Sequence, residues 1–256
     1  GTAHEGASVV RLDVFFGGHQ MTPADVQGRV VLVIDVLRAS TTVAVALANG
    51  AKAVIPFESS DEVVARGKQF ERDDVLLAGE RRMHAIPGFD LGNSPREYSA
   101  EAVEGKTVLL TTTNGTVALA GIQGARDVVV ASYVNYSAVS TIIRAAGRGE
   151  ADVTIVCAGR DRQFALEDAA CAGRFTRAVS RPSTIRLNDA AQACSMIDRR
   201  YGDRLDRLFE DSEHGRALAE AGFAEDLIVC ANVDSHPVIP IYHDRQITKL
   251  GPDRER

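Results

Sequence analysis

"VVLVIDVLRASTTVAVAL", residues 30–47, begins as an unbroken apolar run and continues as an alanine-rich stretch introduced by hydroxyl side chains. A run of Val, Leu and Ile bounded by a polar residue is typical of a strand buried on both faces of a parallel sheet. The stretch after it has helical character, and Ser and Thr are favoured at helix starts because their oxygens accept hydrogen bonds from first-turn N–H groups. The segment therefore predicts one strand-turn-helix unit.

Five further apolar runs have the same character, and the segments between them are long enough for crossover helices. These runs are residues 51–57, 74–80, 106–112, 127–132 and 152–159. The run at 9–16 alternates more between polar and apolar residues and is predicted to be an edge or antiparallel strand. We therefore expect an α/β fold with a mostly parallel sheet flanked by helices.

The pattern changes after residue 160. Amphipathic periodicity predicts helices over three segments, residues 164–179, 188–200 and 204–221. The segments 226–233 and 238–250 then return to strand or extended character. Because no linker, low-complexity tract or fixed repeat interrupts the chain, we expect a single α/β domain over residues 1–256 with a more helical C-terminal portion, including a possible helical subregion at 164–221.

The composition excludes several classes of protein. Lys and Arg total 29 against 35 Asp and Glu, and this net charge of −6 argues against a general nucleic-acid binder, although a local pocket for a small anion stays open. No apolar run approaches the length of a membrane span and no signal segment is recognisable, so we expect a cytoplasmic protein without a membrane partner.

The four widely spaced cysteines are predicted to be reduced core residues. A homodimer is the default expectation.

Polar residues follow several of the predicted strands at the point where each strand ends. Asp35, Glu80, Asn114 and Gly159 come from four separate segments. In open parallel sheets the ligand crevice lies outside the carboxyl ends of the strands, so these residues are expected to meet there. The alternative is that these residues are polar only because the chain reaches the protein surface where each strand ends.

Two hydroxyl-rich helix starts suggest a ligand with two anionic groups. Arg38, Ser40 and Thr41 form the first, and "TTTNGT" at 111–116 forms the second. Unpaired N–H groups and a positive local dipole favour an anion at such a start, and an Arg side chain offers paired donors to phosphate or sulfonate oxygens. Each start could equally be a plain N-cap.

Acidic residues lie at or near the same predicted edge. They are Asp35, Glu80, Asp90, Glu167 and Asp168. Carboxylates beside anion-binding donors are expected where Mg²⁺ bridges the two, since this ion takes one or two carboxylates together with waters and phosphate oxygens. Favourable interaction with a helix dipole is the alternative for the Glu167–Asp168 pair. His84 and His236 are further candidate acid or base groups.

Four motifs in order along the chain resemble the 2-phosphosulfolactate phosphatase (ComB-like) family. They are "VVLVIDVLRASTT", "AGERRMHAIPGFDLGNSPREY", "LLTTTNGT" and "FALEDAACAG", and "VIPIY" near the C-terminus is similar to that family's ending. The resemblance implies an Mg²⁺-dependent hydrolase that converts 2-phospho-3-sulfolactate to 3-sulfolactate and phosphate, a step towards coenzyme M. This sequence departs from the family at Met83, a position where the family commonly has glycine. The departure puts the path of the loop and the substrate preference in question.

The resemblance implies a set of site residues. The catalytic ones are Asp35, Arg38, Glu80 and Asn114, and Asp35, Glu80, Asp90, Glu167 and Asp168 would serve the metal. The substrate-binding candidates, with Gly159 added from its strand-end position, are Ser40, Thr41, Arg81, Asn93, Ser94, Thr111, Thr112, Thr113, Gly115, Thr116, Gly159 and Cys171. The nucleophile is either a metal-activated water or a carboxylate such as Asp35. A phosphatase for another phosphorylated hydroxy acid and a non-catalytic sulfonate- or phosphate-binding protein are the alternatives.

Overall fold

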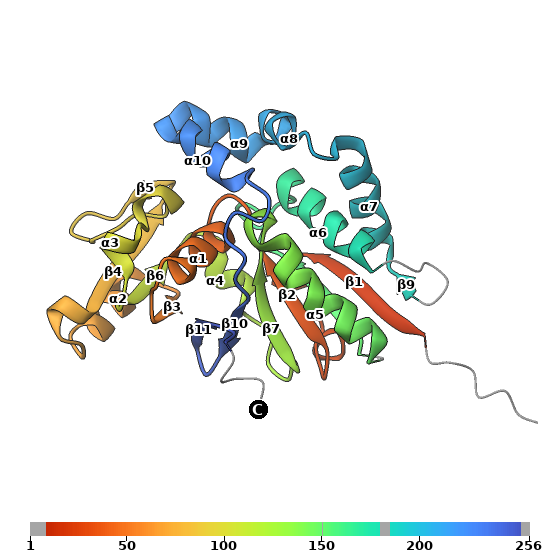
Figure 1. The fold of residues 1–256 in the computed structure, drawn as a ribbon, viewed down its shortest axis with the longest axis horizontal. Helices are drawn as coiled ribbons and strands as arrows, with labels where there is room; N and C mark the ends of the chain where they lie inside the picture. Colours follow the sequence, from red (N-terminus) through yellow and green to blue (C-terminus); the bar gives the residue numbers. More distant parts are fainter. Residues whose placement is uncertain (1–8, 150, 180–184, 252–256) are drawn as a thin grey trace, which may run out of the picture.

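The computed structural model describes residues 9–149, 151–179 and 185–251, and it contains one eleven-stranded sheet with helices around it (Figure 1). The strands are β1 (Val10–Phe16), β2 (Val30–Ile34), β3 (Ala53–Phe57), β4 (Val75–Arg81), β5 (His84–Ala85), β6 (Thr107–Thr111), β7 (Asp127–Ala131), β8 (Val153–Cys157), β9 (Ile185–Leu187), β10 (Pro240–His243) and β11 (Gln246–Lys249). Their order in the sheet is β5-β4-β6-β3-β11-β10-β7-β2-β8-β1-β9.

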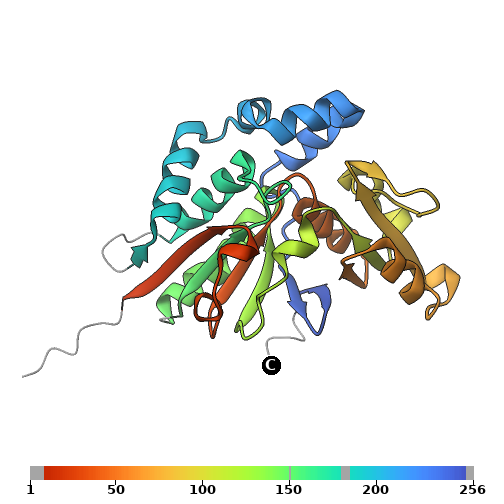
Figure 2. The same cartoon turned by 180° about the vertical axis from the view of Figure 1, so that it is seen from behind.

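The helices follow the strands in the alternation that the sequence predicts. They are α1 (Ala39–Ala48), α2 (Ser60–Gly67), α3 (Ala100–Val103), α4 (Gly115–Ala118), α5 (Tyr136–Arg148), α6 (Leu166–Ala178), α7 (Asp189–Tyr201), α8 (Leu205–Asp211), α9 (Glu213–Leu218) and α10 (Ala224–Cys230). The predicted α/β class with a mostly parallel sheet is confirmed. The helical C-terminal portion is confirmed too, and α8, α9 and α10 lie along the same side of the molecule in both views (Figures 1 and 2).

The sheet consists of two parallel blocks joined by a hairpin. Strands β4, β6 and β3 are parallel to one another, and so are β7, β2, β8, β1 and β9. The β10–β11 hairpin is antiparallel to β7 on one side and to β3 on the other. Following these pairings across the hairpin, the two blocks run in opposite senses.

The junction between the blocks is thin. One residue pair, Ile241 with Val129, joins the hairpin to β7, and one pair, Ile247 with Val54, joins it to β3. Each strand of a sheet is twisted relative to its neighbour, and this twist accumulates across the sheet. Because only one residue pair joins the hairpin to each block, the sheet can also bend easily at these two places. The carboxyl ends of the two blocks can therefore converge despite their opposite senses, and the residues that line the cavity described below show that they do.

Helix α1 packs against both blocks. It contacts β7, β3 and both strands of the hairpin, and all of its residues except the last are buried. A helix that is apolar around its whole circumference needs neighbours on every side, which explains the alanine- and valine-rich sequence from Ala39 onward. The helix thereby fixes the turn after β2 relative to the opposite block.

The structure corrects three expectations about single elements. Strand β1 is neither an edge strand nor antiparallel, because β8 and β9 flank it and both run parallel to it. The segment 204–221 is broken at Ser212, whose side chain accepts a hydrogen bond from Gly215 N–H and so starts a new helix. Most of the segment 226–233 is helical, because a short apolar run alone does not distinguish a strand from a helix.

Other expectations are confirmed. The segment 238–250 forms the β10–β11 hairpin. All four cysteines are buried and unpaired, as predicted for reduced core residues. None of the helices in the described ranges combines the length and apolarity that crossing a bilayer requires.

Close contact between α6 and α7 generates a stability prediction. A Cβ atom on Gly173 would lie 1.9 Å from the carbonyl oxygen of Cys194, so Gly173→Ala forces the two helices apart. We expect a loss of about 1–3 kcal/mol in the free energy of unfolding, measured by urea denaturation. The control is Gly147→Ala in α5, where the nearest atom lies 3.6 Å away. It should be neutral or stabilising by up to about 1 kcal/mol, and equal losses in both variants would contradict the packing argument.

Candidate active site

A cavity of about 390 Å³ lies where the carboxyl ends of β2 and β8 from one block meet those of β4 and β6 from the other. Its lining residues are Asp35, Leu37, Arg38, Glu80, Arg82, Met83, Asn93, Thr112, Thr113, Asn114, Arg160, Asp161 and His214. Seven of these were predicted as site residues from four separate segments of the sequence. The predicted convergence of strand ends is therefore found, although two blocks rather than one sheet edge supply it.

Glu80 is held by three hydrogen bonds at the end of β4. The backbone N–H of Thr113 donates to Oε1 at 2.8 Å, while the Thr113 hydroxyl and the Met83 N–H each donate to Oε2 at 3.0 Å. The "TTTNGT" turn thus uses donors of its first half to fix this carboxylate. A second donor of the turn, Gly115 N–H, bonds to the Thr112 hydroxyl at 2.9 Å.

Asp168 ties together the ends of β2 and β8. It lies in the first turn of α6, and its two carboxylate oxygens accept hydrogen bonds from Val36 N–H at 2.9 Å and Gly159 N–H at 3.0 Å. Its side chain is turned to these backbone groups. Burial raises the pKa of Asp168 well above its ordinary value, and neighbouring Glu167 and Asp35 add to the rise.

Asp35 differs from the other acids of the cavity. It is only 6% exposed, and its carboxylate accepts no hydrogen bond from any described residue. Its position is nevertheless fixed, because its N–H donates to the Ser40 hydroxyl at 2.9 Å. Burial raises the pKa of Asp35 to about 7, with Glu167 and Glu80 contributing, while His214 and Arg38 act in the opposite direction.

Arg38 lines the cavity, but protein groups occupy its guanidinium. One nitrogen forms an ion pair with Asp226 at 3.0 Å, another donates to the Met83 carbonyl at 2.7 Å, and the Phe223 ring packs against the group at 4.4 Å. Both charged side chains are almost fully buried. This pair joins the turn after β2 to α10.

Most of the hydroxyl side chains that were predicted to bind substrate form hydrogen bonds with other protein groups. Thr41 donates to the Val36 carbonyl at 2.8 Å, and Ser94 donates to Asp226 at 2.6 Å. Thr111 accepts from Arg81 at 3.2 Å. Gly115 and Thr116 line a smaller, mostly apolar pocket of about 40 Å³ that Asp35 and Ser40 also border.

Twelve of the nineteen predicted site residues do not line the cavity, among them Asp90, Cys171 and Gly159. Asp90 accepts hydrogen bonds from Leu77 N–H at 2.8 Å and from Arg72 at 2.5 Å. Cys171 is fully buried in the hydrophobic core. Gly159 N–H donates to Asp168 and is therefore not available to a ligand. The sequence placed them correctly near strand ends or in motifs but carried no signal for the direction in which each side chain points.

Some cavity residues were not predicted from the sequence. His214 lies in α9, with Nδ1 3.7 Å from Glu167 Oε1, while the Ser212 hydroxyl donates to Glu167 Oε2 at 2.7 Å. Arg82 also lines the cavity. Arg160 lines it too, and it is one of the polar residues that the sequence places at a strand end, next to Gly159. The helix-start pattern at Ser212 was the one available signal for His214, and a continuous helix was expected over that segment.

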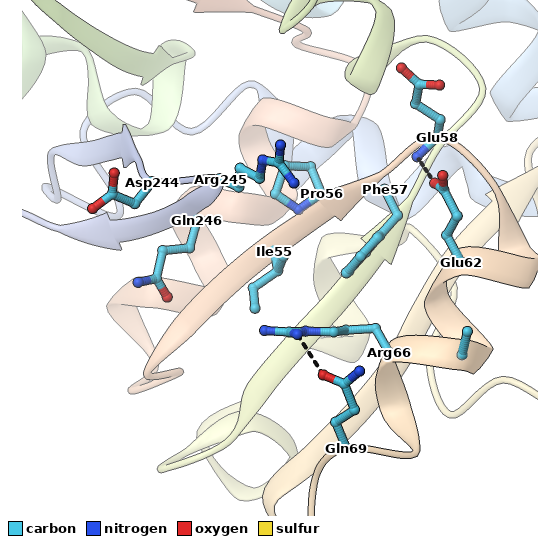
Figure 3. Close-up of a pocket in the computed structure, with 11 residues that line it drawn as sticks. Ile55, Pro56, Phe57, Glu58, Glu62, Arg66, Gln69, Asp244, Arg245 and Gln246 are labelled. Carbon is cyan, nitrogen blue, oxygen red and sulfur yellow. Dashed lines mark hydrogen bonds between the residues drawn. The ribbon is translucent and has the colours of Figure 1, made fainter.

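A larger cavity lies elsewhere in the described structure. It measures about 710 Å³ and lies between β3, α2 and the tip of the β10–β11 hairpin (Figure 3). It contains none of the predicted site residues, and some of its polar groups bond to one another, as Arg66 does to Gln69 at 2.6 Å. The concentration of buried acids therefore identifies the smaller cavity as the candidate active site.

In the described ranges, no group of three or more His, Cys, Asp or Glu side chains could hold a metal ion. Mg²⁺ needs fewer protein ligands, because it keeps waters and binds substrate phosphate oxygens as well. Of the five acids predicted to serve a metal, Asp35 and Glu80 line the cavity. Glu167 and Asp168 are bonded to Ser212 and to backbone amides.

The ion pair between Arg38 and Asp226 should be important for stability. Asp226→Ala leaves a buried guanidinium without its counter-charge, and we expect a loss of about 3–5 kcal/mol in urea unfolding. The double variant Arg38→Met with Asp226→Leu removes both charges and should recover much of this loss. If the double variant is less stable than Asp226→Ala, the unpaired buried charge of Arg38 is not the cause of the loss in stability.

Asp35 should destabilise the fold when it is charged. Its folded-state pKa of about 7 exceeds the ordinary value of 3.8, so the native state loses stability as pH rises from about 4 to about 7. With a chelator present, Asp35→Asn should therefore be more stable than the parent by about 2–4 kcal/mol at pH 8, and the gain should shrink at pH 5. Asp161→Asn, at the exposed rim of the same cavity, is the control and should give no comparable gain. A gain independent of pH would contradict this account.

Comparison with known proteins identifies the family of the chain. The family model described as 2-phosphosulpholactate phosphatase matches residues 18–245. A probable 2-phosphosulfolactate phosphatase of Symbiobacterium thermophilum is 40% identical over 227 residues, covering 88% of this chain and 96% of that protein. Proteins of the same name are 38% identical over 216 residues in Caldanaerobacter subterraneus subsp. tengcongensis (84% of this chain, 88% of that protein) and 36% identical over 215 in Thermotoga petrophila (84% and 89%). The chain therefore belongs to the 2-phosphosulfolactate phosphatase family.

Proposed function

We propose that this protein hydrolyses the phosphate ester of 2-phospho-3-sulfolactate to 3-sulfolactate and phosphate with Mg²⁺ as its cofactor. The observation that carries the proposal is Asp35, a buried carboxylate that accepts no hydrogen bond from the described residues and lines a polar cavity beside Glu80. Burying a negatively charged carboxylate without donors costs free energy unless a cation neutralises the charge or a proton binds to it. The family and the names of its relatives supply the substrate.

Asp35 and Glu80 fit a magnesium ion. They come from different blocks and line one cavity, and Mg²⁺ commonly takes one or two carboxylates and completes its shell with water and phosphate oxygens. When bound there, the ion would neutralise charge on the phosphoryl oxygens. The three donors that hold Glu80 would keep its carboxylate in place as the ligand changes.

Other groups of the cavity suit the phosphoryl group. The Asn93 side chain is buried and lines the cavity, and its amide N–H₂ is a donor of the kind that phosphoryl oxygens accept from. Thr112 and Asn114 border the same space. Over the whole reaction, phosphorus gains an oxygen from water and its bond to the ester oxygen breaks. One proton of the water ends on the ester oxygen, which leaves as the hydroxyl of sulfolactate. Fixed polar groups around phosphorus would stabilise the charge that develops in this step.

Met83 favours a second candidate, a phosphatase for another phosphorylated hydroxy acid. Its backbone has φ +75°, a conformation that favours glycine, and its side chain borders the cavity where the family resemblance leads one to expect no side chain. A single side chain in a pocket can change substrate preference without altering the reacting groups. A panel of phosphorylated hydroxy acids distinguishes the two candidates.

Phosphate release from 2-phospho-3-sulfolactate tests the proposal. The parent protein should release phosphate with Mg²⁺ and stop when a chelator is added. Asp35→Asn should lower kcat/KM by about 100-fold or more, because it removes the charge that faces the cation and substrate. Asp127→Asn, an exposed acid at the start of β7, should behave as the parent. Binding of sulfonate or phosphate without turnover would instead indicate the non-catalytic alternative, and full activity in chelator would exclude the magnesium requirement.

A further inference from the structure

A second chamber adjoins the candidate active site. It measures about 380 Å³, and Phe164, Leu166 and Glu213 are among its lining residues. Arg160, Asp161 and His214 line both spaces, so the two chambers meet at these three residues. Arg160 therefore borders both the space beside Asp35 and the second chamber.

The cations of the two chambers are not equally available to a ligand. Arg38 is neutralised by Asp226 and bonded to Met83. Arg82 stands on the exposed turn between β4 and β5. Arg160 is half-buried, and its guanidinium has neither an ion pair nor a hydrogen bond to any residue that the structure describes.

The turn that carries Arg160 is held rigidly. Arg160 N–H and Gln163 N–H each donate to the carbonyl of the other residue, at 3.1 and 2.8 Å. Asn114 Oδ1 accepts from Asp161 N–H at 3.0 Å, which ties the turn to the opposite block. A Cβ on Gly159 would lie 2.3 Å from the Gln163 carbonyl oxygen, so the backbone has little freedom on that side either. Such a turn presents the Arg160 side chain at low entropic cost.

We propose that Arg160 binds the sulfonate of the substrate and so selects sulfonated phosphate esters. This inference rests on the proposed function, which places the reacting phosphate beside Asp35 and Glu80. In 2-phospho-3-sulfolactate the carboxylate is attached to the carbon that bears the phosphate, whereas the sulfonate is one carbon further away. The sulfonate is therefore the group that reaches the junction of the chambers. A guanidinium offers paired donors that match two sulfonate oxygens.

Three substrates that differ in one group test the assignment. They are 2-phospho-3-sulfolactate, 2-phospholactate, which lacks the sulfonate, and the phosphate ester of 2-hydroxyethanesulfonate, which lacks the carboxylate. Arg160→Ala should lower kcat/KM about 10- to 100-fold for both sulfonated substrates, mainly through KM, and change it less than about twofold for 2-phospholactate. Arg160→Lys, which keeps the charge but not the paired donors, should recover part of the loss.

Arg162→Ala is the matched control. It removes the same charge from the same turn, but Arg162 lines neither chamber, so all three substrates should be hydrolysed as by the parent. An equal loss on all three substrates with Arg160→Ala would overturn the proposal, because Arg160 would then act on the phosphate or on the fold. A loss confined to the two carboxylated substrates would assign it to the carboxylate instead, and no loss would also overturn it.

A binding measurement separates this inference from the proposed function. By calorimetry, 3-sulfolactate should bind the parent more tightly than lactate does, and Arg160→Ala should abolish the difference while the melting temperature stays unchanged. This holds even if the parent releases no phosphate, a result that would contradict the proposed function alone. Equal affinity of parent and Arg160→Ala for 3-sulfolactate would overturn the inference whatever the activity.

Discussion

A buried carboxylate needs hydrogen-bond donors or a cation, and among the described residues this requirement is met for every buried acid around the candidate active site except one. Glu80 accepts three hydrogen bonds, Asp168 accepts two from backbone amides, and Glu167 is bonded to Ser212. Asp35 accepts none from the described residues. Since buried polar groups in proteins are normally satisfied, an exception inside a cavity marks the place where a ligand completes the arrangement.

Hydrogen bonds around the site hold the strand ends together within each block, and others link the two blocks, which only a thin hairpin joins in the sheet. Asp168 connects the ends of β2 and β8, and Glu80 connects β4 with the turn after β6. Arg38 then links the turn after β2 to the Met83 carbonyl of the other block. The polar network of the site is thus part of what fixes the blocks, so the geometry of Asp35 depends on its neighbours even though it bonds to none of them through its carboxylate.

The sequence was informative about position along the chain and uninformative about direction in space. Runs of apolar residues predicted the strands, and their ends correctly located Asp35, Glu80, Thr113 and Asn114 at one cavity. Periodicity could not show that two blocks run in opposite senses, because that depends on the pairing of β10 and β11 with distant strands. It also could not show that Arg38 points to Asp226, a residue in a segment predicted as a strand that is a helix. Contacts between residues 188 positions apart leave no local pattern.

Backbone strain gathers at the mouth of this cavity for a physical reason. Seven non-glycine residues of the described chain have positive φ, and four of them, Arg82, Met83, Asp161 and Arg162, lie on the two turns that border it. Such conformations persist when surrounding bonds over-determine them. Met83 N–H is bound to Glu80 and its carbonyl to Arg38, while Asp161 N–H is bound to Asn114. Each strained turn is therefore fixed by a residue of the site, and with it the backbone from which Arg82 and Arg160 extend.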